Sequence, residues 1–129
     1  MKIKELEKTI NSIEKKRADC IIKLMNIKEM VRGSFHETFT KCGRKGCACE
    51  TGRGHPCQRI TWREKSKART KGVPEDQKKW AKVMTENYKK FRKYRQEIKK
   101  LEVIINQILN EFEAQTVEDS WGKNKNFKI

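Results

Sequence analysis

The residues best suited to chemistry lie in one short run, "CGRKGCACETGRGHPC", at positions 42–57. It contains five sulfur or imidazole donors, Cys42, Cys47, Cys49, His55 and Cys57. Thiolate sulfur and imidazole nitrogen are the ligands that tetrahedral zinc prefers. The run also contains four glycines, which allow the positive backbone angles that a tight loop around an ion needs: Gly43, Gly46, Gly52 and Gly54. The pattern therefore predicts a zinc-binding knuckle.

A tetrahedral site takes four of the five donors. We favour Cys42, Cys47, Cys49 and His55, with Cys57 as the alternative fourth ligand. A site closed by four protein ligands has no open position for water, so we expect the zinc to be structural and not catalytic. An iron–sulfur or other metal site, and a loop without metal, are the alternatives.

No set of residues typical of catalysis stands out elsewhere. His36 and Glu37 are adjacent, but Thr40 stands where a metalloprotease helix would need its second histidine. No Ser/His/Asp or paired-carboxylate arrangement is visible. We therefore expect no enzymatic activity. Cys20 falls outside the knuckle, on an apolar helical stripe, and is expected to be a small buried side chain.

The charge of the chain is strongly positive and unevenly distributed. Its 129 residues include 32 Lys or Arg and 17 Asp or Glu, a net charge of +15. Residues 41–72 carry ten basic and two acidic groups, and residues 78–100 carry the same numbers. Such a local concentration indicates a polyanionic partner, and we expect it to be DNA or RNA. The apolar faces needed to insert into a membrane are expected to be used in helix pairing, so we expect no membrane contact.

The stretch "RITWREKSKARTKG", residues 59–72, places these charges on a predicted hairpin. If residues 64–66 form its loop, Arg63 lies opposite Lys67 and Arg59 opposite Lys71, all on one face, while Trp62 points inward. Like charges across a sheet are destabilising, and a bound phosphate backbone would remove that cost. An inward Trp62 favours neither base stacking nor groove insertion. The predicted nucleic-acid contacts are Arg44, Lys45, Arg59, Arg63, Lys65, Lys67, Arg69, Lys71, Lys78, Lys82, Lys89 and Arg92.

Two long stripes of side chains must position this module. Apolar residues recur at steps of three and four in both halves of the chain, with one polar interruption in each, Arg17 and Asn87. The first stripe is Ile3, Leu6, Ile10, Ile13, Arg17, Cys20, Leu24, Ile27 and Val31. The second is Trp80, Met84, Asn87, Phe91, Tyr94, Ile98, Leu101, Ile105, Ile108 and Phe112. Paired antiparallel, they would set Ile3 near Ile108 and Val31 near Trp80. Pairing between subunits is the alternative.

The predicted fold is α+β and mainly α. It is a long antiparallel helical hairpin, a coiled coil, with a small zinc-binding three-stranded antiparallel β module at one end. We assign residues 1–32 to the first helix, 33–73 to the zinc knuckle and β module, and 74–114 to the second helix, which "VPED" at 73–76 introduces. The tail, residues 115–129, shows no periodicity and is expected to be flexible.

The remaining expectations concern place and partners. No run of 18 apolar residues and no secretory signal is visible, which indicates a cytoplasmic protein. The main functional prediction is a small zinc-stabilised protein that binds the phosphate backbone of nucleic acid. The alternative is a coiled-coil adaptor that forms homo-oligomers or binds an acidic protein partner.

Three stretches together resemble an uncharacterised family of short prokaryotic and mobile-element proteins. They are "VRGSFHETFTKCGRKGCACETGRGHP", "TWREKSKARTKGVPE" and "NYKKFRKYRQEIKKL", and the resemblance covers about residues 31–110. Its pattern is an RGS segment, a CGxxGCxC knuckle, an HGP turn, a Trp strand and a Val-Pro helix start. The resemblance implies that the family's ligands fall on Cys42, Cys47, Cys49 and His55. This chain departs after the histidine, where Pro56 and Cys57 follow directly.

Overall fold

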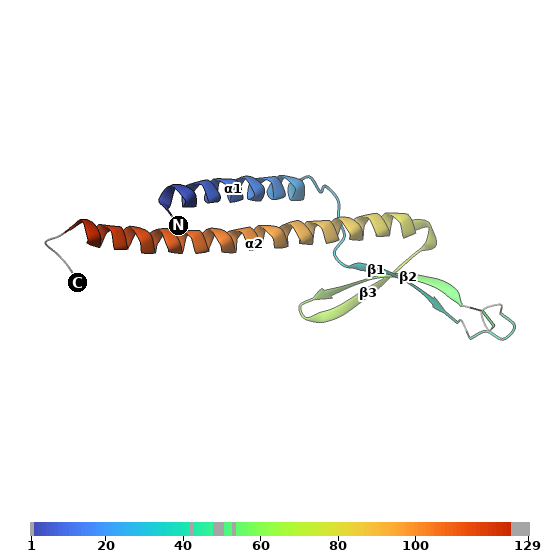
Figure 1. Ribbon diagram of the computed structural model, residues 1–129. Helices are drawn as coiled ribbons and strands as arrows, with labels where there is room; N and C mark the ends of the chain where they lie inside the picture. The colour runs from blue at the N-terminus through green and yellow to red at the C-terminus, as the bar shows by residue number, and fades with distance from the viewer. Residues whose placement is uncertain (1, 42, 48–50, 53, 125–129) are drawn as a thin grey trace. The chain divides into compact units, whose positions relative to one another are not determined.

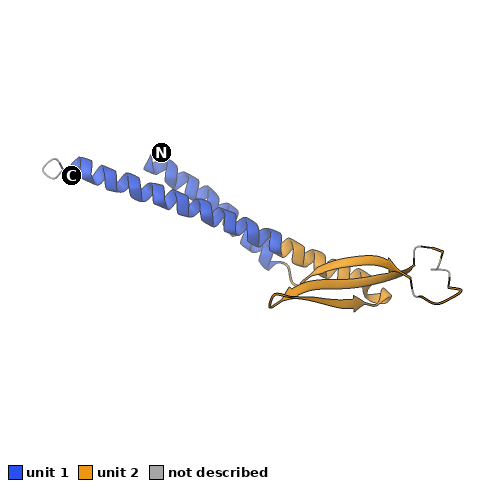
Figure 2. Cartoon of the chain, turned by 90° about the horizontal axis from the view of Figure 1, so that it is seen from below, with its two compact units in different colours: residues 1–26, 92–129 blue, residues 27–91 orange. Residues whose placement is uncertain are grey.

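The computed structural model describes residues 2–41, 43–47, 51–52 and 54–124. This described part of the chain is mainly helical and of the α+β class, with two helices and one small antiparallel sheet (Figure 1). The elements in chain order are α1 (Ile3–Met25), β1 (Ser34–Thr40), β2 (His55–Glu64), β3 (Lys67–Val73), the 3-10 turn η2 (Glu75–Gln77) and α2 (Lys78–Lys123). They form two compact units, residues 1–26 with 92–129 (unit 1) and residues 27–91 (unit 2) (Figure 2).

Unit 1 is a helix pair built on the predicted stripes. Its core is Leu6 and Ile13 from α1 with Leu101 and Ile108 from α2, all at most 8% exposed, and Ile10 and Ile105 pack against it. These positions recur at three- and four-residue steps, so each helix turns one apolar edge toward the other. Both helices thus contribute side chains to one core. The regular interlocking of a coiled coil stays a prediction.

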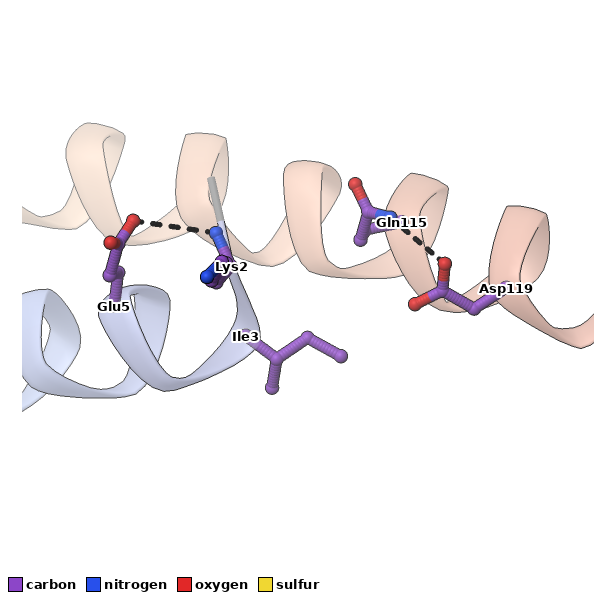
Figure 3. A pocket seen from close by; sticks show the side chains of 5 residues that line it. All are labelled: Lys2, Ile3, Glu5, Gln115 and Asp119. Carbon is purple, nitrogen blue, oxygen red and sulfur yellow. Dashed lines mark hydrogen bonds between the residues drawn. The ribbon is translucent and has the colours of Figure 1, made fainter.

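The register of the helix pair differs from the prediction. Ile3 lines one pocket with Gln115 of α2 (Figure 3), and Gln115 lies seven residues, about two turns, further along α2 than Ile108, the expected neighbour of Ile3. The Arg17 guanidinium reaches the Glu102 carboxylate at 3.3 Å, in the same register. Arg17, the polar interruption of the first stripe, thus has an acidic partner on the opposite helix.

The reason for this difference lies in where α1 ends. The prediction assumed a helix through Val31, but α1 stops at Met25. Beyond that point backbone groups bind α2: the Val31 N–H donates to the Met84 carbonyl at 3.1 Å, and the Asn87 amide donates to the Glu29 carbonyl at 2.9 Å. A chain that is no longer helical advances further per residue than the 1.5 Å of a helix. Val31 therefore still lies near Trp80, as expected, while Ile3 lies near the α2 segment of Gln115 and Asp119.

The second helix is longer than predicted. It continues to Lys123, beyond the expected end at 114, so residues 115–123 of the expected flexible tail are helical. Two side-chain hydrogen bonds within this last stretch join residues one helical turn apart. Gln115 donates to the Asp119 carboxylate at 3.0 Å, and Ser120 donates to the Thr116 carbonyl at 2.8 Å. Residues 125–129 of the tail lie outside the described residues.

Unit 2 contains a three-stranded antiparallel sheet in the order β1-β2-β3. Phe35 pairs with Ile60 and Phe39 with Pro56, so both phenylalanines lie on one face of the sheet. The first part of α2 packs on this face, through Lys78 to Glu37 and Lys82 over the Phe35 ring. Ile60, Ala81 and Met84 are buried in this unit.

The β2–β3 hairpin turns through two residues and not three. Lys65 and Ser66 have φ values of 49° and 67°, the left-handed pair of a type I′ turn. Glu64 consequently pairs with Lys67, Trp62 with Arg69, and the whole register moves by one residue from the prediction. A shift of one residue transfers every side chain of the partner strand to the other face of the sheet.

Candidate functional site

The structure brings two of the predicted metal ligands together. The Cys47 sulfur lies 3.2 Å from Nε2 of His55, which begins β2. Zinc bonds of about 2.3 Å to sulfur and 2.0 Å to nitrogen place two tetrahedral ligands about 3.5 Å apart. The separation of Cys47 and His55 therefore fits two ligands of one ion. Cys42 and Cys49, the other two favoured ligands, lie outside the described residues.

Cys57, the alternative fourth ligand, is placed by strand geometry. It follows His55 by two positions in β2, and alternate residues of a strand point to the same face. It is half-buried and forms no disulfide. His55 and Cys57 are thus on the same face of β2, and the choice between them as fourth ligand stays open. Cys20, which was expected to be a buried side chain, lies on α1 in the other unit and is only half-buried.

The backbone of the loop uses its glycines as predicted at three positions. Gly43, Gly46 and Gly54 have φ values of 75°, 79° and 96°, where other residues are strained. Gly54 is also close to another strand, because a Cβ there would lie 2.7 Å from the carbonyl carbon and oxygen of Thr40. Within residues 2–41, 43–47, 51–52 and 54–124, no group of three or more His, Cys, Asp or Glu side chains gathers as a metal site.

The hairpin cations do not share one face, so the predicted arrangement is wrong. Across to β3, Arg59 pairs with Gly72 and Arg63 with Ala68, so neither arginine faces a cation of that described strand. Lys71 pairs with Ile60, and Arg69 with Trp62. The side chains of β3 cations therefore stand on the face of Ile60 and Trp62, whereas Arg59 and Arg63 stand on the other.

We call the three β3 cations the β3 row: Lys67, Arg69 and Lys71. Their alternation along one strand spaces them about 6.8 Å apart on one face. β3 is an edge strand, and each member of the row is exposed. Arg69 also contacts the Glu64 carboxylate at 3.8 Å, with both side chains about half exposed, which is a weak ion pair.

The α2 cations differ in how they are held. Lys78 binds the Glu37 carboxylate at 2.8 Å, and this hydrogen bond raises the pKa of Lys78 above its ordinary value. The Lys82 ammonium lies 5.6 Å from the centre of the Phe35 ring, within the range of a cation–π contact. Lys78 and Lys82 therefore also tie α2 to the sheet. Lys89 is exposed in unit 2, and Arg92 belongs to unit 1.

The other predicted contacts lie at the two tips of unit 2. Arg44 and Lys45 are exposed in the loop, where the Arg44 carbonyl accepts from the Cys47 N–H at 3.4 Å. Lys65 is exposed in the hairpin turn. The structure thus places the predicted cations on several surfaces, and the β3 row is one ordered set among them.

A cleft of about 400 Å³ was not foreseen from the sequence. It lies within unit 2, where residues before β1, the β2–β3 edge and the start of α2 meet. Trp62 and Trp80 line it together with Lys71 of the β3 row and Arg32. Trp80 was expected in the helix seam, but it is 52% exposed. The sequence did contain one signal of this exposure. Trp80 is the first residue of the second apolar stripe, and at the end of a stripe no further turn of the partner helix covers the side chain.

The chain belongs to an established sequence family. Residues 3–83 match the family described as "Domain of unknown function (DUF6788)". That match begins in α1, includes the whole sheet and ends in the first two turns of α2. No curated protein and no solved structure matches the chain. No described helix is long and apolar enough to cross a membrane.

Proposed function

We propose that this protein binds the phosphate backbone of nucleic acid through the β3 row and the adjoining start of α2. The observation that carries the proposal is the β3 row itself, three exposed cations repeated along one face of an edge strand. Each phosphate that such a cation neutralises releases condensed counterions, which is favourable at moderate salt. Lys79, exposed at the start of α2, extends the positive surface.

The charge of unit 2 supports the same function. Residues 27–91 contain seventeen Lys or Arg and seven Asp or Glu, a net charge of +10 of the chain's +15. Basic residues on an edge strand also discourage pairing with other edges. One or two charges serve that purpose, whereas a net charge of +10 in a unit of this size indicates attraction to a polyanion.

The zinc prediction is part of this proposal. Cys47 and His55, with Cys42 and Cys49 of the sequence pattern, would hold a structural ion that fixes the loop between β1 and β2. Chemically, the ion supplies a crosslink between two strand ends and no reaction. The fit of the Cys47–His55 distance supports it. The proposed protein is therefore a binding module and not an enzyme.

The binding proposal is tested by the salt dependence of affinity. Fluorescence anisotropy of the full chain with a labelled duplex, a single strand and a structured RNA would be measured from low to moderate salt. If three or four phosphates are neutralised, log K falls against log salt with a slope of about −3 on duplex DNA. A flat dependence on all three probes would contradict the proposal.

The zinc proposal has its own measurement. Elemental analysis of natively purified protein is expected to find one zinc per chain, lost in Cys47→Ser and in His55→Ala. Cys20→Ser, a cysteine change on α1, is the matched control and keeps the metal. If Cys57 is the fourth ligand instead of His55, Cys57→Ser loses the zinc and His55→Ala keeps it, so this pair of variants decides the ligand. Metal-free native protein would contradict this part of the account.

Exposed apolar residues of unit 1 favour a second function, self-assembly. At 100° per residue, Val103, Val117 and Trp121 lie on the side of α2 opposite Leu101 and Ile108, and they are 55%, 51% and 37% exposed. Such a face is typical of an interface between helices. Sedimentation of the full chain over a range of concentrations tests this role, and a monomer at all concentrations would exclude it.

A further inference from the structure

The tryptophan cleft of unit 2 combines features that suit one kind of ligand. Trp62 and Trp80 supply flat aromatic surface, and Ile60 supplies an apolar wall. Lys71 and Arg32 add two cations. A volume of about 400 Å³ is within the range of clefts that hold small organic groups. A group that is flat, apolar on its faces and attached to an anion would match all of these.

We propose that this cleft binds an unpaired nucleotide, with its base against the tryptophans and its phosphate near Lys71 and Arg32. This inference rests on the proposed function and deepens it, because it assigns single-stranded nucleic acid as the preferred partner. Aromatic side chains bind bases by stacking, which works with every base because each has a π face. Gln77 lines the cleft too, and a glutamine side-chain amide can offer a donor and an acceptor to a base edge.

The charge around the cleft distinguishes a nucleotide from an apolar peptide. None of the described residues that line it is acidic. Lys71 belongs to the cleft and is also the last member of the β3 row, so the row leads directly to the cleft along one strand face. A single-stranded nucleic acid whose phosphates follow the β3 row would bring a base to Trp80 at the Lys71 end of the row. An uncharged peptide side chain in the cleft would make no use of the cations that lead to it.

Trp80 is the residue on which the test depends. It is 52% exposed, so its indole is accessible and its removal takes little from the core. Trp62 lies within β2 and is less exposed, so replacing it risks the sheet. Trp121, on the α2 segment of unit 1, provides a matched control.

The experiment compares two single strands of the same length and charge, a thymidine oligomer and an abasic strand, with the full chain. The wild type is expected to bind the strand with bases about five- to a hundredfold more tightly, the effect of stacking one base. Trp80→Ala removes this difference and leaves the abasic affinity unchanged. Trp80→Phe retains most of it, and Trp121→Ala retains all of it. Helical circular dichroism confirms the fold of each variant.

Two results would overturn the inference without touching the proposed function. One is equal, salt-dependent wild-type affinity for both strands, which indicates backbone binding alone. The other is a Trp80→Ala variant that keeps the wild-type preference for bases, or loses affinity for both strands equally. Failure of every strand and duplex to bind would contradict the proposed function and this inference together, and would direct attention to a protein ligand for the cleft.

Discussion

The predicted pairing register is wrong in both units, but the consequence of the error differs between the helix pair of unit 1 and the strands of unit 2. In unit 1 the α1–α2 pairing is displaced by about two turns from the prediction, yet Leu6, Ile13, Leu101 and Ile108 are still the core. In unit 2 the β2–β3 pairing is displaced by one residue, and Lys67, Arg69 and Lys71 change face. A register shift of two helical turns leaves the same side chains facing the partner helix, whereas a shift of one residue moves every side chain of a strand to the opposite face. Periodicity therefore predicts a helical core more safely than it predicts a strand surface.

The units also differ in what stabilises them. Unit 1 depends on a narrow apolar seam, in which Leu6 is only 2% exposed. Unit 2 depends more on backbone geometry, including glycines with positive φ at the loop and a left-handed turn at Lys65 and Ser66. Substitutions that affect side-chain burial should act mainly on the first unit, and substitutions that affect the backbone should act mainly on the second.

The largest effect is expected at the backbone of unit 2. Gly54→Ala adds a Cβ at 2.7 Å from the Thr40 backbone and forces alanine to a φ of 96°. Strain and overpacking together should lower the free energy of unfolding by about 2–5 kcal/mol. Gly72→Ala is the matched control, because nothing lies within 4 Å of its Cβ, and we expect a change within about 0.5 kcal/mol. Equal losses of unfolding free energy for the two variants in urea titrations would contradict this expectation.

The next effect is expected in the seam of unit 1. Leu6→Ala deletes the most buried side chain of the helix pair and should destabilise that unit by about 2–4 kcal/mol. Ile22→Ala, at a position that is 60% exposed on the same helix, should have little effect. Amide hydrogen exchange localises the change. Loss of protection in β1, β2 and β3 as large as that in α1 would show that the two units do not unfold separately.

A smaller effect tests the helix register. Arg17 and Glu102 should be coupled, so Arg17→Glu and Glu102→Arg each destabilise the pair, and the double exchange recovers part of the loss. The coupling expected for such an exposed pair is about 0.2–1 kcal/mol in a double-mutant cycle. Zero coupling here, with coupling between residues of a different register, would contradict the observed pairing.

The smallest effect concerns the ion pair between α2 and the sheet. Glu37 raises the pKa of Lys78, so the pair stabilises the fold at pH values below the ordinary lysine pKa and loses this contribution as the pH rises past it. Glu37→Gln should therefore lower the melting temperature by a few degrees at most near neutral pH. The difference from the wild type should shrink above about pH 10. A difference that grows with pH would exclude this origin.

How much the sequence predicts depends on which local signal each element has. The strands, the helix start after Pro74 and the seam residues follow from alternation, proline and three- and four-residue spacing. The hairpin turn does not, because a type I′ turn normally contains Asn or Gly, and Lys65 and Ser66 are neither. The end of α1 at Met25 also escapes prediction, since the segment after it forms hydrogen bonds with a helix distant in sequence: Val31 donates to that helix and Glu29 accepts from it.

The candidate site shows the same division. Cysteine spacing is enough to bring Cys47 and His55 together in the prediction, because both lie in one short loop. The tryptophan cleft brings together Arg32, Trp62 and Trp80, which no spacing rule connects. Sites within one loop can be predicted from a sequence, whereas sites between elements need the register of the strands and the packing of the helix.

The most direct test of the account removes two charges from either face of the hairpin. Lys67→Gln with Lys71→Gln alters the β3 row, and Arg59→Gln with Arg63→Gln alters the opposite face of the same hairpin. Salt-dependent affinity of the full chain for one single strand is then compared with the wild type. We predict that the first double variant reduces the steepness of log K against log salt by about 1.4, at about 0.7 per phosphate contact, and that the second leaves it nearly unchanged. Equal losses from both faces, or a loss confined to Arg59 and Arg63, would contradict the assignment of phosphate binding to the β3 row.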